Sequence, residues 1–146
     1  MLAVQDSPAG RFLDRLGTEL PRPRAIVVAS AHFASAPAVG AAPNPATVHD
    51  FGGFPRELYD IEYPAAGAPE LATGIAGRLE AAGFTPVVSA THGIDHGVWV
   101  PLRRMYPQAD IPVVPLSVNP VGDAAHHLAV GRALAVAAHL VLLLEV

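Results

Sequence analysis

His32 closes a short apolar run near the N-terminus, and its position could give it a chemical role. The run Ala25–His32 reads AIVVASAH, and a continuous hydrophobic run is typical of a buried parallel strand. Ligands and metals gather beyond the carboxyl ends of such strands in open α/β sheets, and imidazole is both a common metal ligand and an acid–base group. His32 is therefore a candidate metal-site residue. The alternative is a histidine that ends a strand with one ring nitrogen bonded to a backbone carbonyl.

Two further histidines lie in a glycine-rich segment. His92 and His96 stand four residues apart, a spacing that on a helix would place two metal ligands on one face. A glycine follows each of them, which argues against a stable helix there. His96 is the stronger candidate, because Asp95 places a carboxylate beside it. An imidazole held near neutral pKa suits proton transfer.

The remaining histidines have weaker claims. His49 lies in the turn-rich segment HDFGGFP, where it could contact a substrate or support the site, or could bond to Asp50 or a backbone carbonyl. His126 and His127 begin a predicted last helix, where the positive end of the helix dipole disfavours protonation. At least one of this pair is expected to face solvent or to pack. His139 lies near the chain end and is assigned no role.

Helix and strand patterns alternate along the chain and would position these residues. Helices are predicted over 7–20, 69–82, 99–106 and 123–138, and strands over 25–29, 86–90 and 111–118; a final apolar run covers 139–146. Pro112 and Pro115 interrupt one strand, which we expect to be irregular or partly unpaired. A long connection over 33–67, rich in Pro, Ala and Gly, is expected to be functional. The alternation predicts an α/β fold with a mainly parallel central sheet flanked by helices.

Composition restricts the class of protein. The 146 residues fit one domain with a hydrophobic core, and 51% hydrophobic with 15% charged residues excludes a disordered chain. The net charge of −4 and the dispersed basic residues argue against nucleic acid as a partner. Cysteine is absent, so any metal would be held by imidazole, carboxylate or water. Without a signal peptide or a span long enough for a bilayer, the chain is expected to be soluble and cytoplasmic.

Several motifs, taken together, resemble a known family. In collinear order the matching segments are Leu20–His32, Val48–Pro55, Tyr59–Pro64, Asp95–Leu102, Met105–Pro112, Leu116–Val118 and His127–Gly131. They resemble the 4,5-DOPA extradiol dioxygenase family, within the class III ring-cleavage enzymes of the protocatechuate 4,5-dioxygenase type. The resemblance runs from the first residues to about Leu134 and is specific for the family rather than for the substrate.

This resemblance implies a chemistry and roles for particular residues. The implied reaction is the O2-dependent opening of a catechol-type, DOPA-like ring beside its two hydroxyls, at a non-haem Fe(II) or Zn(II) site. By resemblance, His32 is a metal ligand and His96 is a catalytic residue near the substrate. His49, Asp95 and His127 would either contact the substrate or support the residues that contact the metal and the substrate. The implied partners are a catechol-type small molecule and O2. A homo-oligomer is a further expectation.

The chain departs from the family pattern at both ends. In the family, a strand ending in a His-Gly metal motif precedes the segment that begins here at Met1, and a long region with another metal-site histidine follows. We therefore expect a single partial domain over 1–146 that keeps one expected ligand. It should be inactive or nearly so by itself, because a mononuclear site needs about three protein ligands. The alternatives are a zinc-dependent hydrolase with a His-rich site and a non-catalytic binding fragment or partner subunit.

Overall fold

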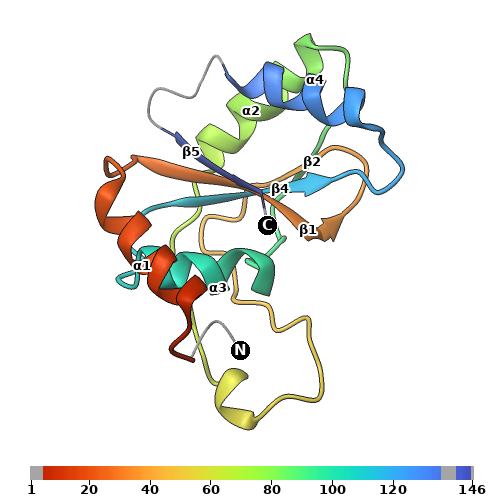
Figure 1. The fold of residues 1–146 in the computed structure, drawn as a ribbon. Coiled ribbons are helices and arrows are strands. Elements are labelled where there is room, and N and C mark those ends of the chain that lie inside the picture. The colour runs from red at the N-terminus through yellow and green to blue at the C-terminus, as the bar shows by residue number, and fades with distance from the viewer. Residues whose placement is uncertain (1–4, 136–140, 146) are drawn as a thin grey trace.

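A mainly parallel sheet forms the centre of the protein in the computed structural model, which describes residues 5–135 and 141–145 (Figure 1). Its strands are β1 (Ala25–Ala34), β2 (Ala38–Gly40), β3 (Val87–Ser89), β4 (Val113–Val118) and β5 (Val141–Glu145). They are ordered β3-β2-β4-β1-β5 across the sheet. β1 pairs in parallel with β4 and β5, and β2 pairs in parallel with β3, whereas β2 and β4 are antiparallel. The predicted α/β class is confirmed.

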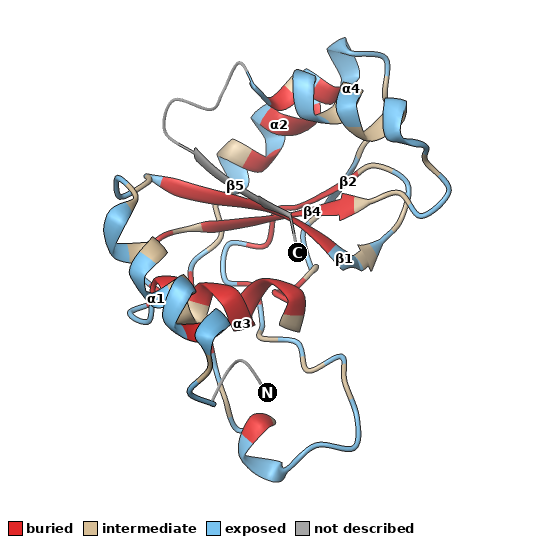
Figure 2. Ribbon diagram, viewed as in Figure 1, coloured by how far each residue is buried: buried red, intermediate tan, exposed pale blue. Residues whose placement is uncertain are grey.

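Two helices cover each face of the sheet (Figure 1). One face carries α1 (Pro8–Glu19) and α3 (His96–Met105), and the other carries α2 (Pro69–Ala81) and α4 (Ala124–Ala135). Ser7 caps α1, because its side chain accepts a hydrogen bond from the Gly10 N–H at 3.0 Å, as expected of a serine before Pro in the first turn. These layers bury the first six residues of β1 and nearly all of β4 from both sides (Figure 2).

The core is divided by the sheet into two hydrophobic clusters. Alternate residues of β1 enter different clusters, with Ile26 and Val28 in one and Val27 and Ala29 in the other, because successive side chains of a strand point to opposite faces. The first cluster includes residues of α3 and the second includes residues of α2. Burial on both faces explains why the run reads as continuously apolar rather than alternating.

The structure extends several predicted elements and adds others. β1 continues to Ala34, so His32 lies within the exposed last part of the strand rather than just beyond it. The predicted long connection contains β2 and a short 3-10 helix, η1 (Arg56–Leu58). α3 begins at His96, three residues before its predicted start. α4 is described to Ala135, and the predicted remainder of that helix and His139 lie outside the described residues.

β4 is the strand that its prolines predicted to be irregular or partly unpaired, and the structure confirms this in part, because its register with β1 shifts after Ser117. It lies between β1 and β2 and pairs with β1 in continuous register from Val113 to Ser117. Its pairing with β2 is confined to Leu116 opposite Val39. A Cβ on Gly40 would lie 3.0 Å from Cδ of Pro115, so a glycine in β2 leaves room for this proline ring inside the sheet.

The buried hydroxyl of Tyr63 gives a first prediction. Tyr63 is 1% exposed, and its hydroxyl donates to the Tyr106 carbonyl at 3.0 Å; burial raises the pKa of this hydroxyl, which therefore stays a donor. Tyr63→Phe should lower the free energy of unfolding by about 1 kcal/mol, measured by urea titration. The control is Tyr59→Phe, which removes a partly exposed hydroxyl with a 3.4 Å contact and should cost less than about 0.5 kcal/mol. Equal losses would contradict the prediction.

Candidate metal centre

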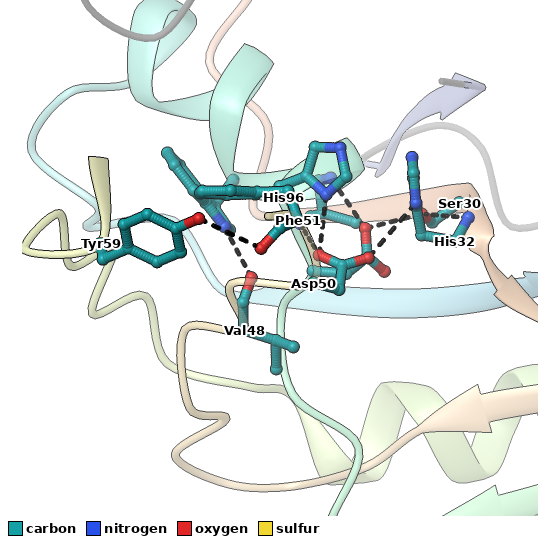
Figure 3. A network of polar contacts seen from close by, with 10 residues as sticks. Ser30, His32, Val48, Asp50, Phe51, Tyr59 and His96 are labelled. Atoms are coloured by element: carbon teal, nitrogen blue, oxygen red, sulfur yellow. Dashed lines mark hydrogen bonds and ion pairs between the residues drawn. The ribbon is translucent and has the colours of Figure 1, made fainter. Parts of the chain in front are cut away.

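Three side chains from distant parts of the sequence meet at one end of the sheet (Figure 3). His32 comes from β1, His96 from the first residue of α3, and Asp50 from the segment between β2 and η1. Asp50 lies between the two imidazoles, with Oδ1 2.8 Å from Nδ1 of His96 and Oδ2 3.2 Å from Nδ1 of His32. The ring centroids of the two histidines are 4.0 Å apart. One ligand atom from each residue lies within 4.8 Å of the others, so this group could hold a metal ion.

The start of α3 fixes the orientation of Asp50. Oδ1 of Asp50 accepts from the backbone N–H of His96 at 3.0 Å as well as bonding to its ring. The first turn of a helix favours a carboxylate, because its N–H groups are unpaired and the helix dipole is positive there. Asp50 is therefore held by the helix end that also carries His96.

Hydrogen bonding decides the charge of Asp50. Burial raises the pKa of this carboxyl, but the hydrogen bonds from the backbone N–H and the ring of His96 outweigh burial, so the pKa lies below its ordinary value. Asp50 is thus a carboxylate at neutral pH and can only accept hydrogen bonds. The Nδ1 of His96 must then donate, which leaves Nε2 of a neutral His96 as the free acceptor.

The three side chains remain accessible to a ligand. The side chains of His32, Asp50 and His96 are 41%, 29% and 25% exposed. Phe51 packs edge-on against His96, with ring centroids 5.3 Å apart, and also contacts Phe54, which is 46% exposed. This combination provides an aromatic wall beside a polar group.

Side-chain hydrogen bonds anchor the segment that carries Asp50 (Figure 3). Nε1 of Trp99 donates to the Val48 carbonyl at 3.0 Å, and the Tyr59 hydroxyl donates to the Phe51 carbonyl at 3.4 Å. Trp99 is fully buried, so one of these anchors belongs to the core. The position of Asp50 is consequently coupled to the packing of α3.

His49 and Asp95, which have predicted supporting roles, lie near the three-residue group but form hydrogen bonds with other partners. Nε2 of His49 is 2.9 Å from the Ile61 carbonyl, the backbone contact weighed as an alternative for this histidine, and its ring also packs near Phe51. Asp95 is 4% exposed and bonds to Ser30 rather than to the ring of His96. The carboxylate that bonds to His96 is Asp50, although Asp95 is its neighbour in sequence.

Two other histidines, His92 and His127, make contacts of their own outside this group. Nδ1 of His127 bonds to the Asp123 carbonyl at 3.0 Å, and the residue lines a small separate cavity formed with residues of β4 and α2. His92 stacks on Phe33 with ring centroids 3.5 Å apart, and burial lowers its pKa. Neither residue belongs to the group of His32, Asp50 and His96.

Asp50 is the member of the group that sequence reasoning missed. From the sequence alone, Asp50 stands out merely as a bonding partner for its neighbour His49. A signal was present, because Asp50 stands in the HDFGGFP segment that carries part of the family resemblance. Its partner His96 lies 46 residues away along the chain, so the contact depends on the tertiary structure.

Comparison with known proteins identifies the family. A family model described as the catalytic LigB subunit of aromatic ring-opening dioxygenase matches residues 11–142. The chain belongs to this family. Its relatives include proteins named 4,5-DOPA dioxygenase extradiol, so this LigB-family chain is related to a group of enzymes. These matches favour the dioxygenase over the alternative of a zinc-dependent hydrolase.

The similarity to these relatives covers most of the LigB-family chain. The Escherichia coli K12 relative is 46% identical over 136 residues, which make up 92% of this chain and 50% of that protein. The Beta vulgaris relative is 44% identical over 140 residues, or 92% of this chain and 52% of that protein. A crystal structure of an uncharacterised Escherichia coli K12 protein superposes with a TM-score of 0.76 at 36% identity, covering 97% of this chain and 53% of the other. The chain thus spans about half the length of the relatives it matches.

The helices of the structure bear on whether the chain could cross a membrane. In residues 5–135 and 141–145, no helix combines the length and the apolar character needed to cross a bilayer.

Proposed function

We propose that this protein takes part in extradiol ring cleavage, the O2-dependent opening of a catechol-type, DOPA-like substrate at a non-haem metal. In this proposal His32 and Asp50 hold the metal, and His96 moves the proton. The observation that carries the proposal is the placement of one carboxylate between two imidazoles, with each oxygen facing a different ring. Membership of the ring-opening dioxygenase family supports the reaction class.

The pair formed by His32 and Asp50 fits a divalent metal. Their facing atoms, Nδ1 and Oδ2, are 3.2 Å apart, and two donors each about 2.1 Å from one ion lie roughly 3.0–3.4 Å apart. Nitrogen and oxygen donors without thiolate suit Fe(II) or Zn(II). We propose Fe(II), because zinc has no redox chemistry. The bound metal would supply a template for both catechol oxygens and a path for electrons to O2.

His96 is arranged as the acid–base group. Its Nδ1 donates to Oδ1 of Asp50 at 2.8 Å, so Nε2 is free to accept a proton from a catechol hydroxyl. The carboxylate stabilises the imidazolium that forms and fixes the ring orientation. Phe51, which packs edge-on against this imidazole, offers an aromatic surface for the substrate ring.

A second arrangement, in which His96 is also a ligand, is favoured by the 4.8 Å clustering of all three groups. The variant His96→Asn separates the two arrangements, because its amide can still donate to Asp50 but it has no imidazole. If His96 moves the proton, the affinity for Zn(II) or anaerobic Fe(II) should stay within about threefold of wild type. If His96 is a ligand, isothermal titration should show a loss of about 100-fold or more, as for the loss of any one ligand of the site.

The activity of this chain by itself is expected to be slow or absent. Two protein ligands are fewer than the three that mononuclear sites ordinarily use. The test is oxygen uptake by the iron-loaded chain with DOPA and with protocatechuate, beside hydrolysis of an activated ester. Turnover at ordinary enzymatic rates would contradict the expected inactivity, ester hydrolysis would favour the hydrolase, and catechol binding without metal would favour a binding fragment. A cytoplasmic location and a homo-oligomeric state stay predictions.

A further inference from the structure

We propose that Ser30 and Asp95 form a positioning pair that ties the end of β1 to the start of α3 and thereby sets the separation of the His32 and His96 imidazoles. The consequence for metal affinity rests on the proposed function. The effect on ring geometry does not, because it concerns the protein without metal.

Ser30 connects the strand to the helix through its side chain. It is completely buried and lies two residues before His32 on β1. Its Oγ donates to Oδ1 of Asp95 at 2.7 Å and accepts from the backbone N–H of His32 at 3.2 Å. One hydroxyl therefore links the backbone of a candidate ligand to the carboxylate that begins α3.

Asp95 completes the connection on the helix side. Its Oδ1 also accepts from the Val98 N–H at 3.3 Å, which makes Asp95 the N-cap of the helix whose first residue is His96. Its Oδ2 is buried without a hydrogen-bond partner among the described residues. Capping can be performed as well by a shorter serine. A cap therefore accounts for the bond to Val98 but not for the reach across to Ser30.

The packing around this pair leaves little room for adjustment. A Cβ on Gly97 would lie 2.8 Å from Cδ2 of His32, 2.9 Å from Oγ of Ser30 and 3.0 Å from Oδ1 of Asp95. The strand and the helix thus approach as closely as a glycine allows. Without the hydroxyl–carboxylate bond, we expect the two elements to separate and the 4.0 Å contact between the imidazoles to loosen.

Asp95 is accordingly a positioning residue in this proposal and does not contact substrate. It is 4% exposed, and its described hydrogen bonds run to Ser30 and to the backbone of its own helix. Of the two roles that the sequence suggests for Asp95, substrate contact and support of the site, this proposal keeps only the support of His32 and His96.

The experiment compares four variants with wild type. Ser30→Ala removes the connecting hydroxyl. Asp95→Ser keeps a capping oxygen on a shorter side chain, and Asp95→Asn keeps both the reach and the accepting Oδ1. The matched control is Ser117→Ala, because Ser117 is the register partner of Ser30 on β4, is 8% exposed and likewise makes two hydrogen bonds, to Ala36 and Ala38. All variants are first checked for folding by circular dichroism and urea titration.

Two readouts are used on the full chain. The first is the nuclear Overhauser effect between the ring protons of His32 and His96 in metal-free protein, which reports their separation. The second is the Zn(II) dissociation constant from isothermal titration. We expect Ser30→Ala and Asp95→Ser to lose most of the ring-to-ring effect and to bind Zn(II) about 10- to 100-fold more weakly. Asp95→Asn and Ser117→Ala should resemble wild type in both readouts.

The outcomes separate this proposal from the proposed function. If wild type shows the ring contact but binds no Zn(II), the metal assignment fails while the positioning pair is still tested by the ring contact. If Asp95→Ser keeps the ring contact, Asp95 is merely a helix cap and the positioning proposal is overturned. If Ser30→Ala does not fold, the comparison of Asp95→Ser with Asp95→Asn decides by itself.

Discussion

Replacing Asp50 with asparagine is expected to abolish measurable metal binding, with an affinity loss of at least about 100-fold. The amide removes the negative charge and can present an acceptor to one imidazole only, whereas the carboxylate faces both His32 and His96. Isothermal titration with Zn(II) and anaerobic Fe(II) measures the loss. The control is Asp60→Asn, which changes an exposed residue just after η1 with the same change in net charge. Equal binding by the two variants would remove Asp50 from the metal site.

The same substitution should change how stability depends on pH in the metal-free protein. Burial opposes ionisation of Asp50, but the hydrogen bonds from His96 prevail and lower its folded-state pKa. A carboxyl with a lowered folded-state pKa stabilises the fold above its unfolded-state pKa, and this stabilisation is lost as the pH falls through the folded-state value. The stability difference between wild type and Asp50→Asn should therefore shrink below about pH 4. Urea titrations at pH 7 and pH 3 measure it, and a constant difference would contradict the linkage.

Helices and strands that are marked by a pattern within their own residues can be predicted from the sequence. The apolar run of β1 and the periodic stripe of the helix over Pro69–Ala81 both follow from the burial of one strand or one helix face. The sequence predicts the start of α3 three residues too late, because Gly97 lowers helix propensity. In the structure the Asp95 cap offsets that loss, and the close approach of Ser30 requires a residue without a side chain.

Contacts between residues far apart in the sequence could not be predicted at the site. Adjacency in sequence suggested Asp95 as the carboxylate partner of His96, but the first turn of α3 directs the ring toward Asp50 instead. β2 is three residues long and gives too short a pattern to recognise. Pro115 reads as a strand breaker, although the facing glycine in β2 accommodates its ring. The surroundings of His96 and of Pro115 therefore depend on partners far away in the sequence.

Gly97→Ala should have the second large effect, because the added methyl group would enter the tightest packing of the site. The His32 ring is partly exposed and could turn away from the new Cβ. Ser30 and Asp95 are buried and cannot retreat without separating β1 from α3. We therefore expect a destabilisation of about 1–3 kcal/mol, typical of overpacking, together with a loss of the His32–His96 ring contact.

Gly74→Ala is the matched control for this substitution. Gly74 lies inside α2, and nothing is within 4 Å of the Cβ that it would gain. There the alanine should stabilise the protein by about 0.5–1 kcal/mol through helix propensity. The two glycine-to-alanine changes should thus have opposite signs in urea titrations, although both occur in helices. If Gly97→Ala also stabilised the protein and kept the ring contact, the close approach of strand and helix would not constrain the site, and the separation of the two imidazoles would need another cause.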